Sequence, residues 1–287
     1  MVRLGLHVSI AGSVDLAVGR AVEKGCDAFQ IFSTNPRGWR ARAISGPEAQ
    51  RFIAGRRRAG LAPAVSHMPY LPNLASSRQE VYVRSVQALQ EEMQRCRMLD
   101  MDYLVLHLGS HLGAGREGGL ERIVQALRAA FSGDFGRTVL LLESSAGSKN
   151  GIGGRFEDLA AILDQLAEST ARRRLGVCLD TCHLHAAGYD LRSQAALDGT
   201  LDELVGLMGL DRVGLVHLND CKSDLGSHLD RHEHIGLGRI GLEGFRAVLS
   251  HPALSGLPMI LETPVDSRRD DLGNLLAARE LANASRT

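Results

Sequence analysis

Short apolar runs alternate with longer amphipathic stretches along the whole chain. Each run is followed by a polar or small residue, and the eight runs span residues 4–8, 28–32, 62–65, 103–108, 139–142, 175–179, 213–218 and 259–261. The stretches between them carry apolar residues at a spacing close to that of a helix turn, and they include 14–24, 80–99, 120–131, 156–166, 201–208 and 242–249. Short strands that alternate with helices predict βαβ units and a parallel sheet.

The length of the strand–helix repeat indicates which kind of α/β fold the chain adopts. Eight strand–helix units in 287 residues give about 36 residues each, which is the size that a (β/α)8 barrel requires. No linker or low-complexity segment interrupts the pattern. We therefore expect one domain over residues 1–287, an α/β TIM barrel whose eight parallel strands are surrounded by helices.

Composition and charge exclude several classes of protein. Hydrophobic residues make up 44% of the chain and charged residues 23%, which is typical of a globular protein and excludes a disordered one. The 33 basic residues balance the 33 acidic ones, so an overall basic coat is excluded, although a local basic face is not. No apolar run reaches the ~18 residues of a membrane span, and the N-terminus lacks a signal-peptide core. With five sparse cysteines, these features predict a cytoplasmic protein.

Residues of metal-ligand type lie at the ends of successive predicted strands. They are His67, His107, Glu143, Asp180, His217 and Glu262. Successive members are 36 to 45 residues apart, close to one repeat, so in a barrel they ring the carboxyl-terminal mouth, where active sites of this fold lie. One such residue alone is more often hydrogen-bonded structure than a ligand. Six that converge would be costly to bury without a counter-charge, and a metal cluster supplies that charge.

Further candidate ligands follow the sixth and seventh strands. His183 lies three residues after Asp180, and a later loop carries Asp230, His232 and His234. Residues two apart in an extended segment point the same way, so Asp230 and His232 could bind one ion. Spacing alone does not exclude His234 as a ligand of the same ion.

The donor types indicate zinc. The candidates comprise five histidines and four carboxylates: His67, His107, His183, His217, His232, Glu143, Asp180, Asp230 and Glu262. Imidazole-rich sites favour zinc over magnesium or calcium, which prefer oxygen. Three zinc ions that share one carboxylate fit this count, and their charge would exceed that of the carboxylates and attract an anion such as phosphate. No nucleotide cofactor is expected.

Two groups of short motifs are the most specific stretches of the chain. They are Leu-Asp-Thr-Cys-His at 179–183 with Ala-Gly-Tyr-Asp at 187–190, and His-Leu-Asn-Asp at 217–220 followed by Asp-Arg-His at 230–232. These motifs resemble those of the endonuclease IV family, the zinc-dependent apurinic/apyrimidinic endonucleases of base-excision repair. The resemblance covers nearly the whole chain. It implies a TIM barrel with a trinuclear zinc site.

The resemblance also implies how the ligands are divided. His67 and His107 would hold one zinc ion and share Glu143 with a second. The second ion would also take Asp180, His217 and Glu262. The third ion would take His183, Asp230 and His232. This division favours His232 over His234 as the ligand.

The partner that the resemblance implies is double-stranded DNA with abasic sites. Arg37, Tyr70 and Leu71 would enter the bent duplex at the lesion, because apolar or planar side chains offset the unstacking that extrudes a nucleotide. Considered alone, Tyr70 and Leu71 would be assigned to loop packing. The chain departs from many members at Leu108, where they have proline, and at Gly38, which replaces a polar side chain.

The expected reaction is hydrolysis of the phosphodiester on the 5′ side of an abasic site, leaving a 3′-hydroxyl and a 5′-deoxyribose phosphate, together with trimming of blocked 3′ ends. Zinc makes hydroxide available near neutral pH. Glu262 is expected to orient or deprotonate the attacking water, with Glu143 and Asp180 as further catalytic residues. The alternatives are a metal-dependent sugar isomerase or epimerase with the same barrel, and a DNA-lesion binder without turnover.

The remaining histidines receive minor roles. His7, on the first strand, is expected beside the ligands but not among them. His228, His234 and His251 are expected to be exposed in loops. The protein is expected to act as a monomer without a membrane partner.

Overall fold

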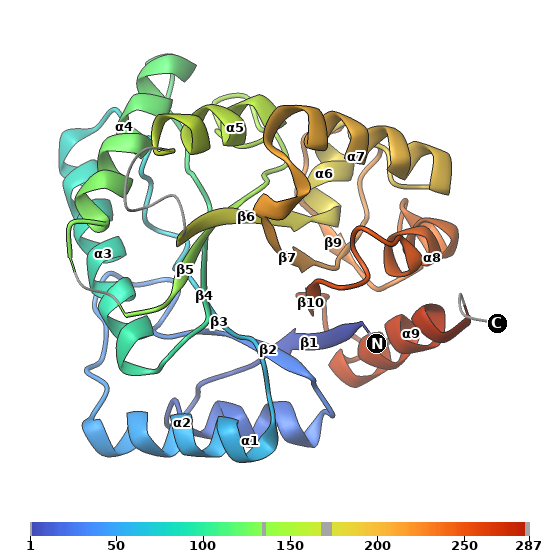
Figure 1. Ribbon diagram of the computed structural model, residues 1–287, viewed down its shortest axis with the longest axis horizontal. Helices are drawn as coiled ribbons and strands as arrows, with labels where there is room; N and C mark the ends of the chain where they lie inside the picture. The colour runs from blue at the N-terminus through green and yellow to red at the C-terminus, as the bar shows by residue number, and fades with distance from the viewer. Residues whose placement is uncertain (1, 134–135, 168–173, 285–287) are drawn as a thin grey trace.

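A closed barrel of parallel strands forms the centre of the protein in the computed structural model, which describes residues 2–133, 136–167 and 174–284. The strand order is β1-β10-β7-β6-β5-β4-β3-β2, and the helices surround the strands (Figure 1). The strands are β1 (Arg3–His7), β2 (Ala28–Phe32), β3 (Ala64–His67), β4 (Tyr103–Leu106), β5 (Val139–Glu143), β6 (Leu175–Asp180), β7 (Val213–His217) and β10 (Pro258–Leu261). The predicted (β/α)8 fold is confirmed.

Two predicted strands have different ends in the structure. The third begins at Ala64 rather than at residue 62, because Pro63 has no N–H group to donate to a strand ladder, and it continues to His67. The fourth ends at Leu106 rather than at residue 108, so His107 lies just beyond the strand. Both differences leave the histidine at the carboxyl-terminal mouth.

The helices pack against the outer face of the barrel. They are α1 (Leu16–Glu23), α2 (Gly46–Ala59), α3 (Gln79–Met98), α4 (Arg116–Ala130), α5 (Phe156–Gln165), α6 (Thr181–Ala187), α7 (Gln194–Met208), α8 (Gly241–Ser250) and α9 (Asp271–Ala284). A short 3-10 helix, η2 (Leu210–Arg212), precedes β7, and β8 (Asp220–Cys221) pairs with β9 (His232–Glu233) outside the barrel. Among the described residues, no helix is both long and apolar enough to cross a membrane.

The sequence pattern did not predict α2 or the short α6. The apolar positions of α2 are diluted by a run of three arginines, Arg56 to Arg58. Its start carries a clear local signal, however. Ser45 and Glu48 form a capping box, and a proline occupies the first turn, a position that proline favours.

A ring of apolar side chains fills the inside of the barrel. Seven strands contribute one residue each, namely Ala28, Val65, Val105, Leu141, Cys178, Leu215 and Ile260. On the eighth strand, β1, Gly5 takes this place and pairs with Ala28 and Ile260. A Cβ atom at Gly5 would lie 2.0 Å from the carbonyl oxygen of Ala28, so the strands can close only around a glycine.

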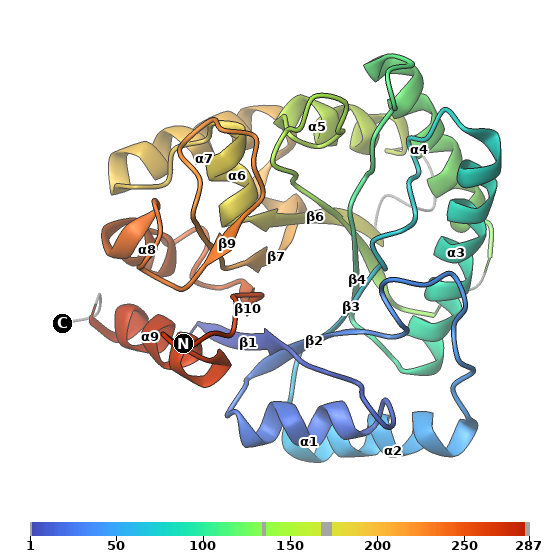
Figure 2. The same ribbon diagram turned by 180° about the vertical axis from the view of Figure 1, so that it is seen from behind.

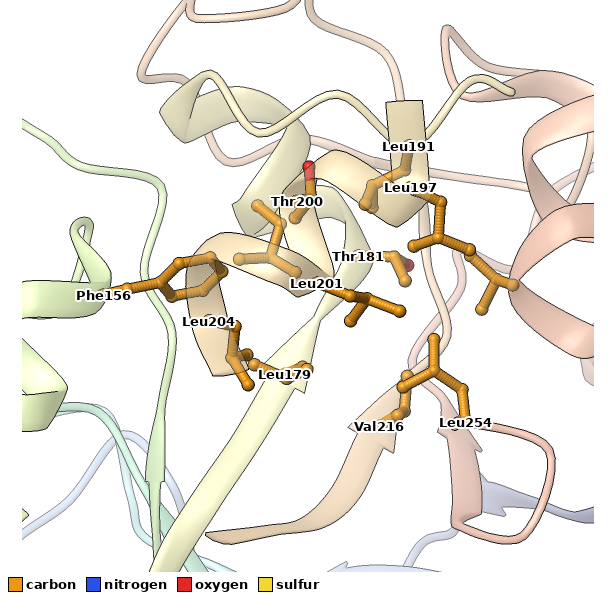
Figure 3. A pocket seen from close by; sticks show the side chains of 12 residues that line it. Phe156, Leu179, Thr181, Leu191, Leu197, Thr200, Leu201, Leu204, Val216 and Leu254 are labelled. Atoms are coloured by element: carbon orange, nitrogen blue, oxygen red, sulfur yellow. The ribbon is translucent and has the colours of Figure 1, made fainter. Parts of the chain in front are cut away.

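A larger apolar core separates the strands from the helices. Between β6 and α7 it is built from leucines spaced at one face of the helix, and Leu197, Leu201 and Leu204 point towards Leu179 and Val216 (Figure 3). This packing fixes the strands from outside. The carboxyl ends of the strands are left free to carry polar side chains.

Replacement of Gly5 by alanine tests the closure of the barrel. We expect Gly5→Ala to lower the free energy of unfolding by about 1–3 kcal/mol, because the new methyl group overpacks the β1–β2 contact. Urea unfolding of the metal-free protein measures this change. Gly19→Ala on α1 is the control, since no atom lies within 4 Å of the added Cβ, and a gain of about 0.5–1 kcal/mol is expected there. An unchanged urea midpoint for Gly5→Ala would contradict the interpretation.

Candidate metal centre

The residues two positions after the apolar ring form a polar layer at the mouth. Side chains two apart on a strand share a face, so this layer also points into the barrel. Its members are His7, Gln30, His67, His107, Glu143, Asp180, His217 and Glu262. Six of the eight are the strand-end residues that the sequence singled out. The other two, His7 and Gln30, complete the layer on β1 and β2.

Three further candidates reach the layer from outside the barrel. Asp180 ends β6 and also caps α6, where its Oδ1 accepts the backbone N–H of His183 at 2.8 Å, so His183 turns back over the mouth. The connection from β8 to β9 lies against α6 (Figure 2), to which the backbone N–H of Gly226 and His228 donate hydrogen bonds. This connection brings Asp230 and His232 to the same place.

Glu143 lies between two ligand groups. Its Oε2 is 3.0 Å from Nε2 of His67 and 3.4 Å from Nδ1 of His107. Its Oε1 is 3.1 Å from Nδ1 of His217, which also lies 3.3 Å from Oε2 of Glu262. One carboxylate therefore presents a separate oxygen to each group.

Ligand atoms gather into three clusters. Within each, the atoms lie within 4.8 Å of one another, and the clusters are His67–His107–Glu143, Glu143–Asp180–His217–Glu262 and His183–Asp230–His232. In the third cluster, Asp230 stands between the two rings, 3.2 Å from Nε2 of His183 and 3.3 Å from Nε2 of His232. All nine predicted ligands thus lie in one region. Cys182 also comes within 4.8 Å of Asp180 and His232.

Hydrogen bonds to one nitrogen of four of the five rings leave the other nitrogen facing the carboxylates. Nδ1 of His67, His183 and His232 donates to the backbone carbonyls of Met68, Ser144 and Glu262 at 2.7–3.0 Å. His217 is reversed, because its Nε2 donates to Oε1 of Gln30 at 2.9 Å and its Nδ1 faces Glu143. Metal-binding histidines characteristically donate their other N–H in this way.

The electrostatics of the site require positive charge. Burial works against ionisation, but the charges of His107 and His217 hold the pKa of Glu143 well below its ordinary value. Burial likewise opposes the protonation of His183, yet the charge of Asp180 and the hydrogen bond to Asp230 raise the pKa of that ring well above its usual range. Protons on imidazoles therefore balance buried carboxylates.

The donor set fits metal cations. Nitrogen and oxygen donors converge in small groups, and the hydrogen-bonded nitrogens of four of the five rings are directed away from the centre of each group. Nε2 of His232 is buried and faces carboxylate oxygens of Asp230 and Asp180 at 3.3 and 3.8 Å, as expected of an atom that would hold a cation together with them. Two of the three groups contain two imidazoles and one carboxylate each, a donor set that suits zinc.

Two residues that support the ligands were missed by sequence reasoning. Gln30 contacts both His217 and Glu262. Asn219 donates from Nδ2 to Oδ2 of Asp180 at 2.7 Å, and its Oδ1 accepts the backbone N–H of Glu262 at 2.8 Å. The available signal was the two-residue period, since Gln30 aligns with the other layer residues and Asn219 follows His217 by two.

The predictions for the histidines outside the clusters agree with the structure in part. Nδ1 of His7 lies 3.3 Å from Oε1 of Glu262, beside the ligands as expected. His228 is exposed, and His251 is half-buried. The expectation that His234 is exposed is wrong, because it is completely buried and bonds through Nε2 to Asp266 at 3.0 Å and through Nδ1 to Asn274 at 2.9 Å.

The predicted DNA contacts lie at the rim of the mouth. Tyr70 and Leu71 are 61% and 38% exposed, and both line a pocket of about 510 Å³ that also reaches His107 and Asp230. Arg37 is exposed on the neighbouring loop, which is tied to Tyr70 by a backbone hydrogen bond from Tyr70 to Pro36.

The structure shows the surroundings of Leu108 and Gly38, the two residues at which the chain departs from the family pattern. Leu108 is completely buried beside the pocket. Gly38 has no backbone need for glycine, because its φ is not positive and the nearest atom to an added Cβ would be the Asn35 side chain at 3.7 Å. A larger side chain could therefore be accommodated at position 38.

Comparisons with known proteins agree with this geometry. Residues 18–286 match the AP_endonuc_2 family model, described as a xylose isomerase-like TIM barrel. A curated protein from Methanoculleus marisnigri, named probable endonuclease 4, is 54% identical, with 99% of this chain and 100% of that protein covered. The crystal structure of endonuclease IV from Thermus thermophilus is 40% identical with a TM-score of 0.86, covering 98% of this chain and 99% of that one. An L-ribulose 3-epimerase structure, 18% identical with a TM-score of 0.69 and covering 100% and 96% of the two chains, shares the fold alone. This chain belongs to the endonuclease IV family.

Proposed function

We propose that the protein is a zinc-dependent DNA-repair endonuclease that cuts the phosphodiester on the 5′ side of abasic sites and leaves a 3′-hydroxyl and a 5′-deoxyribose phosphate. The observation that carries the proposal is the convergence of nine nitrogen and oxygen donors into three clusters joined by Glu143, beside a pocket edged by Tyr70 and Leu71. The relatives named endonuclease 4 and endonuclease IV support the same activity.

Each cluster would hold one zinc ion. His67 and His107 with Glu143 offer three donors to the first, and the second would use Glu143, Asp180, His217 and Glu262. The third would be held by His183, Asp230 and His232. When bound, the ions would supply a water of lowered pKa and positive charge for the phosphate oxygens.

Glu262 is the carboxylate best placed to take a proton from the attacking water. Its side chain is 18% exposed, whereas those of Glu143 and Asp180 are at most 1% exposed. A water that enters from the mouth can therefore reach Glu262 but not the other two. Glu143 and Asp180, the other two carboxylates predicted to be catalytic, would act as metal ligands beside the rings of His217 and His183.

The rim residues would bind the damaged duplex. Tyr70 and Leu71 present apolar surface to solvent beside the pocket, and such side chains can fill the space that an extruded nucleotide leaves. Arg37 on the adjoining loop would contact the phosphate backbone. The same hydrolysis at a recessed end would trim blocked 3′ termini.

Neither alternative function fits the site as well. Isomerase and epimerase sites are rich in carboxylates and hold one or two metal ions, whereas five histidines occupy the clusters here. The epimerase neighbour is similar in fold only. A protein that only binds lesions would not need a set of metal-ligating residues to generate a nucleophile. Monomeric state and cytoplasmic location stay predictions.

Glu262→Gln tests the catalytic role. The amide keeps the shape of the side chain but cannot accept a proton, so we expect cleavage of an abasic duplex to fall by about 10²–10⁴-fold while binding stays within a few-fold. A nicking assay and a filter-binding assay measure the two effects. Glu121→Gln, an exposed residue on α4, is the control. Full activity of Glu262→Gln would refute the role.

Substitutions at the rim test lesion recognition. Tyr70→Ala and Leu71→Ala should each weaken binding to an abasic duplex by about 1–3 kcal/mol, with little effect on an undamaged duplex. Tyr70→Phe keeps the ring and should bind as the wild type does. Equal weakening on both duplexes would assign these side chains to general packing of the loop.

Zinc binding should release protons. Burial opposes the protonation of His232, but the hydrogen bond to Asp230 and the charge of Asp180 outweigh it and raise the pKa of this ring to about 9. At pH 7 the metal-free ring is therefore protonated, and zinc must displace that proton. Affinity should rise between pH 6.5 and pH 8.5. Calorimetry in two buffers of different ionisation enthalpy measures the release. Saturation at three ions per chain is expected, and fewer than two would favour the epimerase alternative.

A further inference from the structure

Gln30 is a member of the polar layer that provides no ligand atom to the clusters. It lies on β2, is completely buried, and pairs in register with His7 on one side and Val65 on the other. Its amide reaches across the barrel mouth in two directions. Nε2 donates to Oε1 of Glu262 at 2.6 Å and to Nδ1 of His7 at 3.0 Å, and Oε1 accepts from Nε2 of His217 at 2.9 Å.

The orientation of this amide is determined by Glu262. A carboxylate offers only acceptors, so the NH₂ end of Gln30 must face it. The carbonyl oxygen of Gln30 is thereby directed at His217. Nε2 of His217 must then carry a hydrogen, and Nδ1 is the nitrogen left for a ligand. Nδ1 is the atom that faces Glu143 at 3.1 Å and Glu262 at 3.3 Å.

His217 differs in this respect from the rings of His67, His183 and His232. Those three rings donate to backbone carbonyls, which the fold supplies whatever the side chains are. His217 donates instead to a side chain. A single substitution at position 30 can therefore remove the group that selects its ligand nitrogen.

We propose that Gln30 is a positioning residue of the central cluster, fixing which nitrogen of His217 faces the metal and the rotation of the Glu262 carboxylate at the same time. The inference deepens the proposed function, because it concerns the cluster that contains Glu262. Loss of the amide would leave Nε2 of His217 and Oε1 of Glu262 without this partner. The first and third clusters have no contact with Gln30 among its hydrogen bonds and should keep their metal.

The test uses two substitutions with the full-length protein. Gln30→Met keeps the length of the side chain and removes all three hydrogen bonds of the amide. Gln30→Glu keeps an acceptor for His217 but puts a second carboxylate against Glu262. Thr138→Val is the matched control, because it deletes one buried hydrogen bond, from Thr138 Oγ1 to the carbonyl oxygen of Met101 at 2.9 Å, just before the strand that ends at Glu143.

Zinc content at fixed free zinc, measured by atomic absorption, is the first readout. The wild type and Thr138→Val should bind the same number of ions, and both Gln30 variants should bind one fewer, with about 10–100-fold weaker affinity for that ion. Cobalt in place of zinc provides a second readout, since the visible absorption of the central ion should be lost or shifted. Cleavage should fall in kcat more than in KM.

The outcomes separate the possible roles. Lower thermal stability of either Gln30 variant with unchanged zinc content and an unchanged cobalt spectrum would show a merely structural role and overturn the proposal. If Gln30→Met does not fold, Gln30→Glu decides by the same two readouts. Failure of the wild type to bind zinc or to cut an abasic duplex would overturn the proposed function instead, so the two failures are distinguishable.

Discussion

The burial of carboxylates at one end of an apolar barrel is the constraint on which the rest of the site depends. Glu143 and Asp180 are almost completely inaccessible, and a buried carboxylate is costly unless it is paired and hydrogen-bonded. The chain meets this cost by surrounding them with imidazoles, whose protons balance the charge when no cation is present. Because those protons and a metal ion compete for the same nitrogens, the stability of the site and its affinity for metal are linked.

The geometry of the barrel brings together polar side chains that are far apart in the sequence. In each strand the apolar ring residue and the polar layer residue are two positions apart, so one register places eight small or apolar residues below and eight polar ones above. Gly5 is the exception in the lower ring, and its missing side chain gives β2 room to approach β1. At the end of β1, the side chain of Gln30 on β2 reaches Glu262, which follows β10.

The regular repeat of strands and helices explains how much of the fold and of the candidate site could be predicted from the sequence. Eight strands, the barrel and the six candidate ligands at the strand ends follow from a repeat that is local in the sequence. Gln30 was missed because it lies inside an apolar run, Ala-Phe-Gln-Ile-Phe, where it does not end the strand. Only the alignment of interior layers shows that it belongs with the ligands.

Other errors have long-range causes. His234 is buried by Asn274 and Asp266, which follow it by more than thirty residues and pack over it from α9 and the segment before that helix. No local pattern around His234 contains this information. The helix α2 was missed for the opposite reason, since its capping signal is local but its apolar face is weak and its stability comes from packing on the barrel.

The exposure of three carboxylates of the clusters increases from the barrel axis to the rim. Glu143 is 1% exposed, Glu262 18%, and Asp230 52%. The inner carboxylate lies between two clusters where solvent does not reach it, whereas the outer two are accessible from the mouth. Asp230 is carried by a connection outside the barrel, so the third cluster depends on the β8–β9 pairing as well as on the strands. The centre of such a site is fixed by the barrel alone, whereas its edge is fixed by the barrel and by a connection outside it.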